Sequence, residues 1–416
     1  MTEVTVPNLT TDQTARIQLQ VSDGTATATE EVTLTLTNVD LQPRYSEAGM
    51  VFSVETIGEY SYTGIVTKLF ENLTAIFESG KAEDIDYDTS SSEVLVNPYL
   101  ADGTIRDVEN VSIINDFFDT TFPSPDAVID YDDDTVYIIN TDRAAPPDFK
   151  SVEVQATQPC IAQNVLSFLV VGQRDNGIRI LTSSFVENQP PDYTVVETIE
   201  PTTSVCAINS FNQGAIAYDE KTGEVLLLRY VDAAGNFLNW STSNSDDIVS
   251  MAVAERVVPD VNFPEGVNGK FVKAIPYQSS FIADRGLALL YSDGNVEGNH
   301  RIVFARSPTN RNQIPFLDNK VLEWNYGIPE NAKSVTIGGI SGSFDEVIIA
   351  TKDSPFAVIF SQSNTQRQAT EWTGPFYMEV GLGAADISTY FSNPTGRALW
   401  VNYPNENKIK LLDPSP

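Results

Sequence analysis

The chain has 416 residues, with 25 Lys and Arg against 57 Asp and Glu, so its net charge is −32 when the single histidine is neutral. This length allows two or three average domains, or one small domain followed by a large all-β domain. The charge argues against nucleic-acid binding, which needs a basic stripe for the phosphates, and against docking on anionic lipid. Hydrophobic residues make up 41% of the chain, which is enough for a packed core. No apolar run approaches the roughly 18 residues of a membrane span, so we expect no membrane insertion.

The chain is poor in the residues that build common catalytic and metal sites. His300 is the only histidine, and it lies in a segment rich in Gly and Asn, where we expect an exposed structural side chain. A Ser/His/Asp triad or a His-rich zinc site would have to use this one residue. The two cysteines exclude a disulfide-rich scaffold and a metal site with four thiolates.

The N-terminal segment alternates between apolar and polar residues in two runs. Every second residue is apolar in residues 17–21 and again in residues 32–36, and Asp23 and Gly24 lie between the runs. This pattern predicts a β-hairpin with one buried face. Two strands cannot bury such a face by themselves, so the hairpin needs further strands to pack against.

The stretch VSDGTATATEEVTLTLTNVD, followed by LQPR, resembles the closing hairpin and linker of cadherin-like and immunoglobulin-like modules in bacterial surface proteins. The resemblance implies that residues 1–42 are the C-terminal part of a β-sandwich whose first half is missing. It also implies that the natural protein extends upstream of Met1 to a signal peptide, which would make the protein extracellular or bound to the cell surface. The alternative is a small β-cap that belongs to the next domain.

From about residue 48 onward, short β-rich runs are separated by clusters of Gly, Pro, Asn, Asp and Ser. Only residues 63–80 could pass for a long helix, and their Thr, Val and Phe content suits strands as well. One unit recurs, made of a short strand, a polar turn and a more apolar strand. Its mean spacing is about 50 residues, the size of a β-propeller blade. The units are residues 84–97, 128–140, 160–172, 206–219, 273–292, 335–353 and 386–404.

We therefore expect an all-β chain, with a partial cadherin-like or immunoglobulin-like sandwich over residues 1–42 and a seven-bladed β-propeller over residues 43–416. Six or eight blades, or a double sandwich, are the alternatives. The last unit stops one strand short, and a strand from residues 48–80 can complete the final blade. The ring would then be closed by strands from both ends of the domain, which leaves no free sheet edge.

The tetrapeptide Ile-Asp-Tyr-Asp occurs twice, at matching positions of the first two units. If it forms the first strand of each blade, it runs beside the central channel, and strand alternation places both aspartates of each copy on one face. Oxygen ligands in this arrangement suit calcium. The alternative is solvated carboxylates that face a water-filled channel. The candidate metal ligands are Asp86, Asp88, Asp130 and Asp132, with Gln163 and Asn209 at the corresponding places in the next two units.

Cys160 and Cys206 open the third and fourth units at equivalent positions. Neighbouring first strands would bring them close together, so a disulfide is geometrically conceivable, and export from the cell favours it. The alternative is a pair of buried free thiols.

Aromatic and cationic residues offer weaker signals. Each tryptophan lies near an expected strand end or turn, where it could stack on a sugar or pack between blades. The scattered arginines could clamp an anionic sugar, although nothing in their spacing requires it. These residues are Trp240, Trp324, Trp372 and Trp400, and Arg174, Arg229, Arg285 and Arg306.

Two functions follow from this sequence. The favoured one is a binding or adhesion module whose propeller loops present a site for a glycan or an extracellular protein, because no catalytic constellation is recognisable. The alternative is an enzyme acting on an extracellular polysaccharide, a lyase or a glycosidase. In that case Asp86 and Asp130 would act as acid and base, or Tyr87 or Tyr131 would act as base. Calcium is the one cofactor that the sequence suggests.

Overall fold

The computed structural model describes most of the chain in segments. They are residues 13–22, 27–36, 51–52, 54–69, 74–79, 81–86, 91–96, 108–114, 126–131, 136–139, 151–154, 158–165, 168–184, 192–211, 214–238, 247–278, 285–306, 316–325, 327–335, 345–352, 354–362, 372–392 and 396–413. The chain divides into two compact units, Met1–Val51 and Phe52–Pro416, which we call the hairpin unit and the propeller unit. The short strand β3 (Val51–Phe52) spans the boundary. These segments contain no α-helix, and the 3-10 helix η4 covers Pro404–Glu406.

The hairpin unit contains two antiparallel strands, β1 (Gln13–Ser22) and β2 (Thr27–Leu36). In their register Ile17 lies opposite Val32, and Ala15 lies opposite Leu34. Directly opposed residues share a face of a sheet, so the apolar positions of both strands fall on one face. The sequence pattern predicts this hairpin. Its relation to a cadherin-like or immunoglobulin-like module stays a prediction.

The described strands of the propeller unit form seven sheets in which neighbouring strands are antiparallel. The first sheet contains β5 (Val66–Leu69), β6 (Thr74–Phe77), β7 (Ala82–Asp86) and β8 (Ser91–Val96), and the second contains β9 (Val108–Ile114), β10 (Asp126–Tyr131), β11 (Val136–Ile139) and β12 (Ser151–Val154). The third contains β13 (Pro159–Val165), β14 (Phe168–Gln173), β15 (Ile178–Ser184) and β16 (Asp192–Ile199), and the fourth contains β17 (Val205–Phe211), β18 (Gly214–Asp219), β19 (Glu224–Val231) and β20 (Ser250–Val257).

The remaining three sheets continue the same order along the chain. The fifth contains β21 (Lys270–Gln278), β22 (Arg285–Ser292), β23 (His300–Arg306) and β24 (Phe316–Trp324). The sixth contains β25 (Ile328–Val335), β26 (Asp345–Lys352), β27 (Phe356–Gln362) and β28 (Trp372–Glu379), with the short strand β3 as a fifth strand beside β28. The seventh contains β29 (Asp386–Ser392), β30 (Gly396–Tyr403), β31 (Lys408–Asp413) and β4 (Glu55–Ser61).

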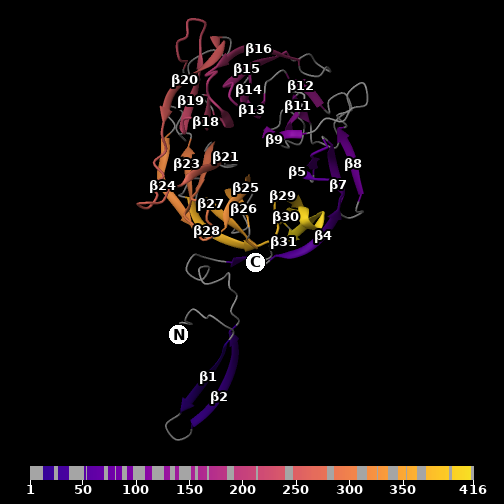
Figure 1. Ribbon diagram of the computed structural model, residues 1–416, viewed down its shortest axis with the longest axis vertical. Helices are drawn as coiled ribbons and strands as arrows, with labels where there is room; N and C mark the ends of the chain where they lie inside the picture. The colour runs from indigo at the N-terminus through magenta and orange to yellow at the C-terminus, as the bar shows by residue number, and fades with distance from the viewer. Residues whose placement is uncertain are drawn as a thin grey trace. The chain divides into compact units, whose positions relative to one another are not determined.

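The sheets are arranged in a ring. The first strand of each sheet contacts the first strand of the next, from β5 through β9, β13, β17, β21 and β25 to β29, and β29 contacts β5 again. Figure 1 shows these strands on the inside of the ring and the fourth strands on its outside. Antiparallel sheets of four strands, repeated around an axis, define a β-propeller.

The seventh sheet is built from both ends of the propeller unit. Strand β4 pairs with β31, so that Ile409 lies opposite Tyr60 and Lys408 lies opposite Ser61. The Tyr62 hydroxyl donates a hydrogen bond of 2.6 Å to Asn402 Oδ1. Residues 63–80, which could pass for a helix in the sequence, supply strands β5 and β6 instead.

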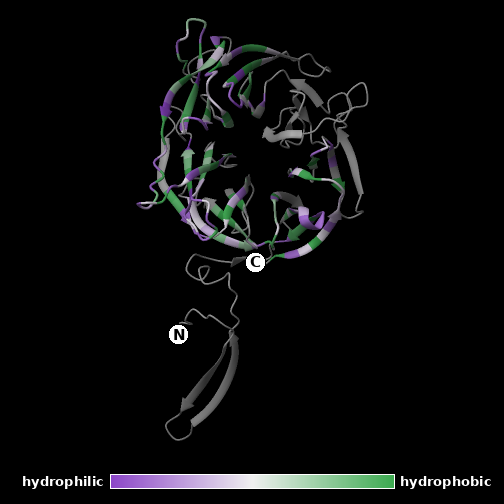
Figure 2. Cartoon of the chain, in the orientation of Figure 1, coloured by the Kyte–Doolittle hydropathy of each residue, from purple (hydrophilic) through white to green (hydrophobic). Residues whose placement is uncertain are grey.

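The core lies between successive sheets. Strands β14 and β18 are buried along their whole length, as expected for strands covered on both faces. One apolar cluster joins the third and fourth sheets, with Val170 and Leu226 among its members. Another joins the fourth and fifth sheets through Tyr218 and Leu289. Figure 2 shows apolar residues concentrated on the strands of the ring.

Five sheets carry a buried polar residue in the last two positions of the second strand. In the fourth sheet Asp219 accepts hydrogen bonds from the backbone N–H groups of Ser204 and Lys221, at 3.0 and 3.1 Å. It also accepts one of 2.7 Å from the Thr222 hydroxyl. This carboxylate therefore organises the turn between β18 and β19. The five residues are Gln173, Asp219, Ser292, Thr351 and Asn402.

Two expectations from the sequence are wrong in detail. The first two repeat units do not begin in first strands, because residues 84–86 belong to the third strand β7 and residues 128–131 to the second strand β10. Every hairpin of an antiparallel meander has the same alternation, so periodicity by itself does not show which hairpin is innermost. His300 is fully buried rather than exposed.

Candidate functional site

The predicted calcium ligands do not lie on innermost strands. Asp86 is the last residue of β7 and Asp130 lies in β10, so the premise that both border the ring axis is wrong. Asp88 and Asp132 lie outside the described residues, as does Tyr87, and the side chains of Asp86 and Asp130 are not described. Calcium binding by these four aspartates stays a prediction. Among the side chains that the structure describes, no group of three or more His, Cys, Asp or Glu could hold a metal ion.

Gln163 and Asn209 serve the packing of the sheets. Both are at least 98% buried. The Asn209 amide donates to the carbonyl oxygens of Tyr277 and Gly286 in the next sheet, at 2.5 and 2.8 Å. Gln163 Nε2 lies 3.4 Å from the Ser210 hydroxyl. Their amides therefore tie neighbouring sheets together, and their part in a calcium site stays a prediction.

The cysteines lie at equivalent irregularities of two neighbouring innermost strands. In β13 the register shifts between Pro159 and Ile161, and Cys160 is the residue in between. Cys206 occupies the same place in β17, between Val205 and Ala207, and it is disulfide-bonded. Cys160 is the one other cysteine of the sequence.

Three of the four tryptophans are packed inside the propeller and offer no sugar platform. Trp372 stacks on Phe304 with a ring-centre distance of 4.2 Å and an angle of 5°. Trp324 packs against His300, and its Nε1 donates to the Gly327 carbonyl at 3.2 Å. Trp400 is also buried, whereas Trp240 lies outside the described residues.

The arginines singled out in the sequence do not form one clamp. Arg229 lies in β19, donates to the Leu238 carbonyl at 3.2 Å, and lies over the Phe237 ring. Arg174 lies in the exposed turn after β14. Arg285 begins β22 and Arg306 ends β23, on different strands of the fifth sheet.

An ion pair between two innermost strands is a further polar feature of the described residues. Lys68 in β5 and Asp386 in β29 form an ion pair of 3.4 Å, and their side chains are 11% and 5% exposed. Asp386 also accepts a hydrogen bond of 2.7 Å from the Leu69 N–H and one of 3.0 Å from the Ile387 N–H. The pair therefore joins the first and seventh sheets where the ring closes.

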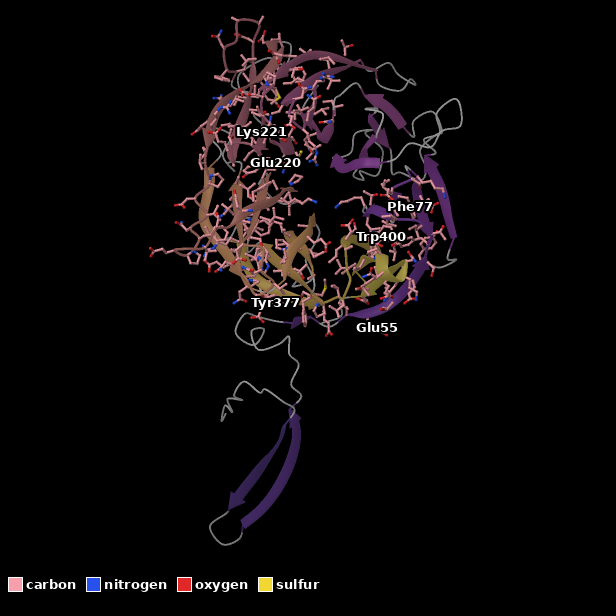
Figure 3. The ribbon with its side chains drawn as sticks, viewed as in Figure 1. Glu55, Phe77, Glu220, Lys221, Tyr377 and Trp400 are labelled. Carbon is pink, nitrogen blue, oxygen red and sulfur yellow. The ribbon has the colours of Figure 1, made fainter. Side chains whose placement is uncertain are left out.

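A second lysine belongs to the same electrostatic system. Burial lowers the pKa of Lys273, in β21, to about 7, and the positive charge of Lys68 adds to this effect. The negative charges of Asp386 and Glu220 raise the pKa of Lys273 and so oppose this effect. Figure 3 shows nitrogen-tipped side chains that extend toward the centre of the ring from both sides.

Glu220 and Arg174 extend the system into the turns of the third and fourth sheets. Desolvation raises the pKa of Glu220, while Arg174 and Lys273 counteract this rise. Glu220 is labelled in Figure 3 in the turn between β18 and β19. Five charged residues from five sheets are thus linked by pairwise electrostatic interactions, to which Asp219 adds through its effect on Glu220, and we call these five residues the axial charge cluster. They are Lys68, Arg174, Glu220, Lys273 and Asp386.

Sequence reasoning missed most of this cluster, although a signal was present. Lys273 and Asp386 are the first residues of two repeat units, and each directly precedes the apolar marker of its unit. A comparison of these positions would have brought Lys273 and Asp386 together, whereas Lys68 lies before the first unit. Arg174 was noted only as one of several scattered cations.

The fold and the cluster define the class of this molecule, a β-propeller with charged residues of both signs around its axis. No family model and no curated protein matches the sequence. The chain is similar to the Cps50 (Swd1) β-propeller domain of Myceliophteria thermophila, with a TM-score of 0.49, 8% identity, and coverage of 86% of this chain and 99% of that one.

Two further solved structures are similar to the chain. The WD40 domain of Toxoplasma gondii coronin gives a TM-score of 0.48 at 10% identity, with 88% of this chain and 87% of that one covered. The N-terminal domain of Nup159 gives a TM-score of 0.43 at 8% identity, with coverage of 88% and 96%. Within the described segments, no helix is long and apolar enough to cross a membrane.

Proposed function

We propose that the protein is a binding module, a seven-bladed propeller that binds a glycan or an extracellular protein at the mouth of the ring where the axial charge cluster lies. The observation that carries the proposal is the cluster itself. Five sheets contribute one charged group each, and such a convergence of polar groups is typical of sites that orient a ligand. The cluster contains cations although acidic residues outnumber basic ones more than twofold in this chain.

The turns around the cluster support a role in recognition. Arg174 and Glu220 lie in exposed turns, where loops on a rigid scaffold commonly carry binding residues. Lys221, in the same turn as Glu220, forms an ion pair of 2.8 Å with Asp175, which joins the fourth sheet to the third. A partner with charges of both signs can therefore meet complementary groups along this mouth.

Export from the cell is part of the proposal. The disulfide-bonded Cys206 supports it, because such bonds persist mainly in oxidising compartments. The resemblance of residues 1–42 to modules of bacterial surface proteins points in the same direction. A strongly acidic chain also stays soluble outside the cell and discourages nonspecific anionic partners.

The test is a thermal-shift series on the full chain with acidic and neutral polysaccharides, and with calcium and EDTA as separate arms. A ligand present at a hundred times its dissociation constant stabilises the folded state by about 2.7 kcal/mol. We expect a partner to raise the melting temperature of the wild type and to lose this effect when Glu220→Arg reverses a charge of the cluster.

The matched control is Glu255→Arg, the same charge reversal on the outermost strand β20. It should respond to the partner as the wild type does. Equal stabilisation of all three proteins would place the binding site elsewhere and overturn the proposal. A shift with calcium that EDTA reverses would instead support the prediction about Asp86, Asp88, Asp130 and Asp132.

A further inference from the structure

The chain contains two Asn-Gly sequences, Asn176-Gly177 and Asn268-Gly269. Asparagine is one of the thermolabile residues of proteins. A glycine after it makes the amide more reactive, because glycine has no side chain to shield its backbone nitrogen and moves freely. That nitrogen can attack the asparagine amide carbon when no other group holds its N–H. The two sequences have the same chemistry, and the structure gives them different surroundings.

Asn176-Gly177 is held in the turn between β14 and β15. The Gly177 N–H donates a hydrogen bond of 3.0 Å to the Thr203 carbonyl. The side-chain amide of the fully buried Gln173 donates to the Asn176 carbonyl at 3.0 Å. Gly177 is itself buried, and a Cβ added there would collide with the Glu200 carbonyl oxygen. The nitrogen that would attack is therefore occupied, and it becomes free only when this turn opens.

Asn268-Gly269 lies in the connection between β20 and β21. The turn before it ends at Val267, whose N–H donates to the Pro264 carbonyl at 3.0 Å, and β21 begins at Lys270. Asn268, between these two points, is exposed. Within the part of the chain that the structure describes, neither Asn268 nor Gly269 makes a hydrogen bond. The amide and the nitrogen that can attack it are therefore both available.

The same connection is packed through the backbone of Gly269. A Cβ added to this glycine would collide with the Phe263 ring, so the ring lies directly on the glycine. The guanidinium of Arg301, in β23, lies 5.0 Å from the centre of the Phe263 ring and donates to the Val261 carbonyl at 3.1 Å. A change in the length of the main chain beside Gly269 would disturb this packing against the fifth sheet.

We propose that Asn268 is a site of spontaneous deamidation, and that its isoaspartate product loosens the connection that leads to β21. The Gly269 nitrogen forms a bond to Cγ of Asn268, the amide nitrogen leaves as ammonia with the proton of the Gly269 N–H, and a cyclic succinimide results. Water then opens the ring at either carbonyl and gives aspartate or isoaspartate. Isoaspartate carries the main chain through its side-chain carbon, which lengthens the backbone. This proposal goes beyond the proposed function and does not depend on it.

The first experiment follows both asparagines in one sample. The full chain is incubated in mildly alkaline buffer, and samples taken over time are digested and analysed by mass spectrometry for the acid form of each peptide. Asn268 should convert about tenfold faster than Asn176, because the hydrogen bond of Gly177 has to open before its nitrogen can react. In concentrated urea this protection is lost, and the two rates should become similar. Equal rates in the folded chain, or an unchanged ratio in urea, would overturn the proposal.

The second experiment separates the longer backbone from the added charge. Ion exchange isolates the aged chain, because deamidation adds a negative charge. The aged chain that contains isoaspartate should melt about 2 °C below the fresh protein, since it loses packing at Gly269. Asn268→Asp carries the same charge on a normal backbone at an exposed position, so it should melt as the fresh wild type does.

The control for other damage during ageing is Asn268→Gln, whose longer side chain closes a ring much more slowly. After the same incubation it should keep the charge and the melting temperature of the fresh protein. A loss of stability in aged Asn268→Gln, or equal melting of the isoaspartate form and Asn268→Asp, would overturn the inferred effect on the connection.

Discussion

Individual buried polar residues have the clearest physical roles in this protein. Asp219 is fully buried, and its carboxylate accepts hydrogen bonds from two backbone N–H groups and one hydroxyl. Burial of a carboxylate is tolerated only when such donors replace water. The turn between β18 and β19, which carries Glu220 of the axial charge cluster, therefore depends on this one side chain.

The substitution Asp219→Ala should lower the free energy of unfolding by about 3 kcal/mol, because buried donors lose a charged acceptor. Urea denaturation measures this change. Asp232→Ala is the matched control, since Asp232 accepts similar bonds from Ala234 and Asn236 in an exposed turn. Its loss should be much smaller, and equal losses would show that burial of Asp219 contributes nothing.

The single histidine allows a prediction about pH. Burial lowers the pKa of His300 in the folded protein, so the unfolded chain binds a proton more readily than the native state does. The stability that depends on neutral His300 is therefore complete above the unfolded value of about 6.5 and is lost as the pH falls toward the folded value. The Ser292 hydroxyl lies 2.9 Å from Nδ1 of His300 and is its hydrogen-bond partner.

The test compares the wild type with His300→Asn by denaturant unfolding at several pH values. The difference in unfolding free energy between the two proteins should shrink as the pH falls below about 6.5. A difference that stays constant across this range would show that His300 takes up its proton equally in the folded and unfolded chains.

At the scale of elements, the repeated hairpin is readable from the sequence but its place in the sheet is not. Alternation predicts strands correctly around Ile161, Ala207, Ala274 and Ile387, which all lie in first strands. The alternation also predicts an innermost strand around Ile85, and this is wrong, because Ile85 lies in the third strand β7, which alternates as an innermost strand does. Only the contacts between sheets distinguish an innermost strand from a later strand of the same sheet.

Strand β4 is the element that closes the ring, and a pair of deletions tests its role. A chain that begins at Val54 keeps β4 and should unfold at nearly the melting temperature of the full chain. A chain that begins at Thr63 lacks β4 and exposes the edge of β31, so it should lose its cooperative transition or aggregate. Calorimetry of both variants measures the effect, and equal transitions would contradict it.

At the scale of the whole molecule, net charge sets the electrostatic background. With a charge of −32, repulsion between carboxylates opposes the compact state, and salt screens that repulsion. Surface ion pairs such as Lys408 with Glu59 act in the opposite direction, but exposed pairs contribute little.

The melting temperature should therefore rise when sodium chloride is increased from about 0.05 to about 0.5 M, across the range where screening shortens to a few ångströms. Differential scanning fluorimetry measures the shift. A fall in melting temperature with salt would show that ion pairs outweigh the general repulsion.

The sequence by itself determined that this chain is all-β, acidic and built from repeated hairpins, because strand alternation and composition are local properties. Only the tertiary structure decided which strands are innermost and which charges meet. Lys68, Lys273 and Asp386 are more than a hundred residues apart from one another in the sequence, and ring closure brings them into one electrostatic system. Long-range interactions of this kind depend on distance in space, which a linear pattern does not contain.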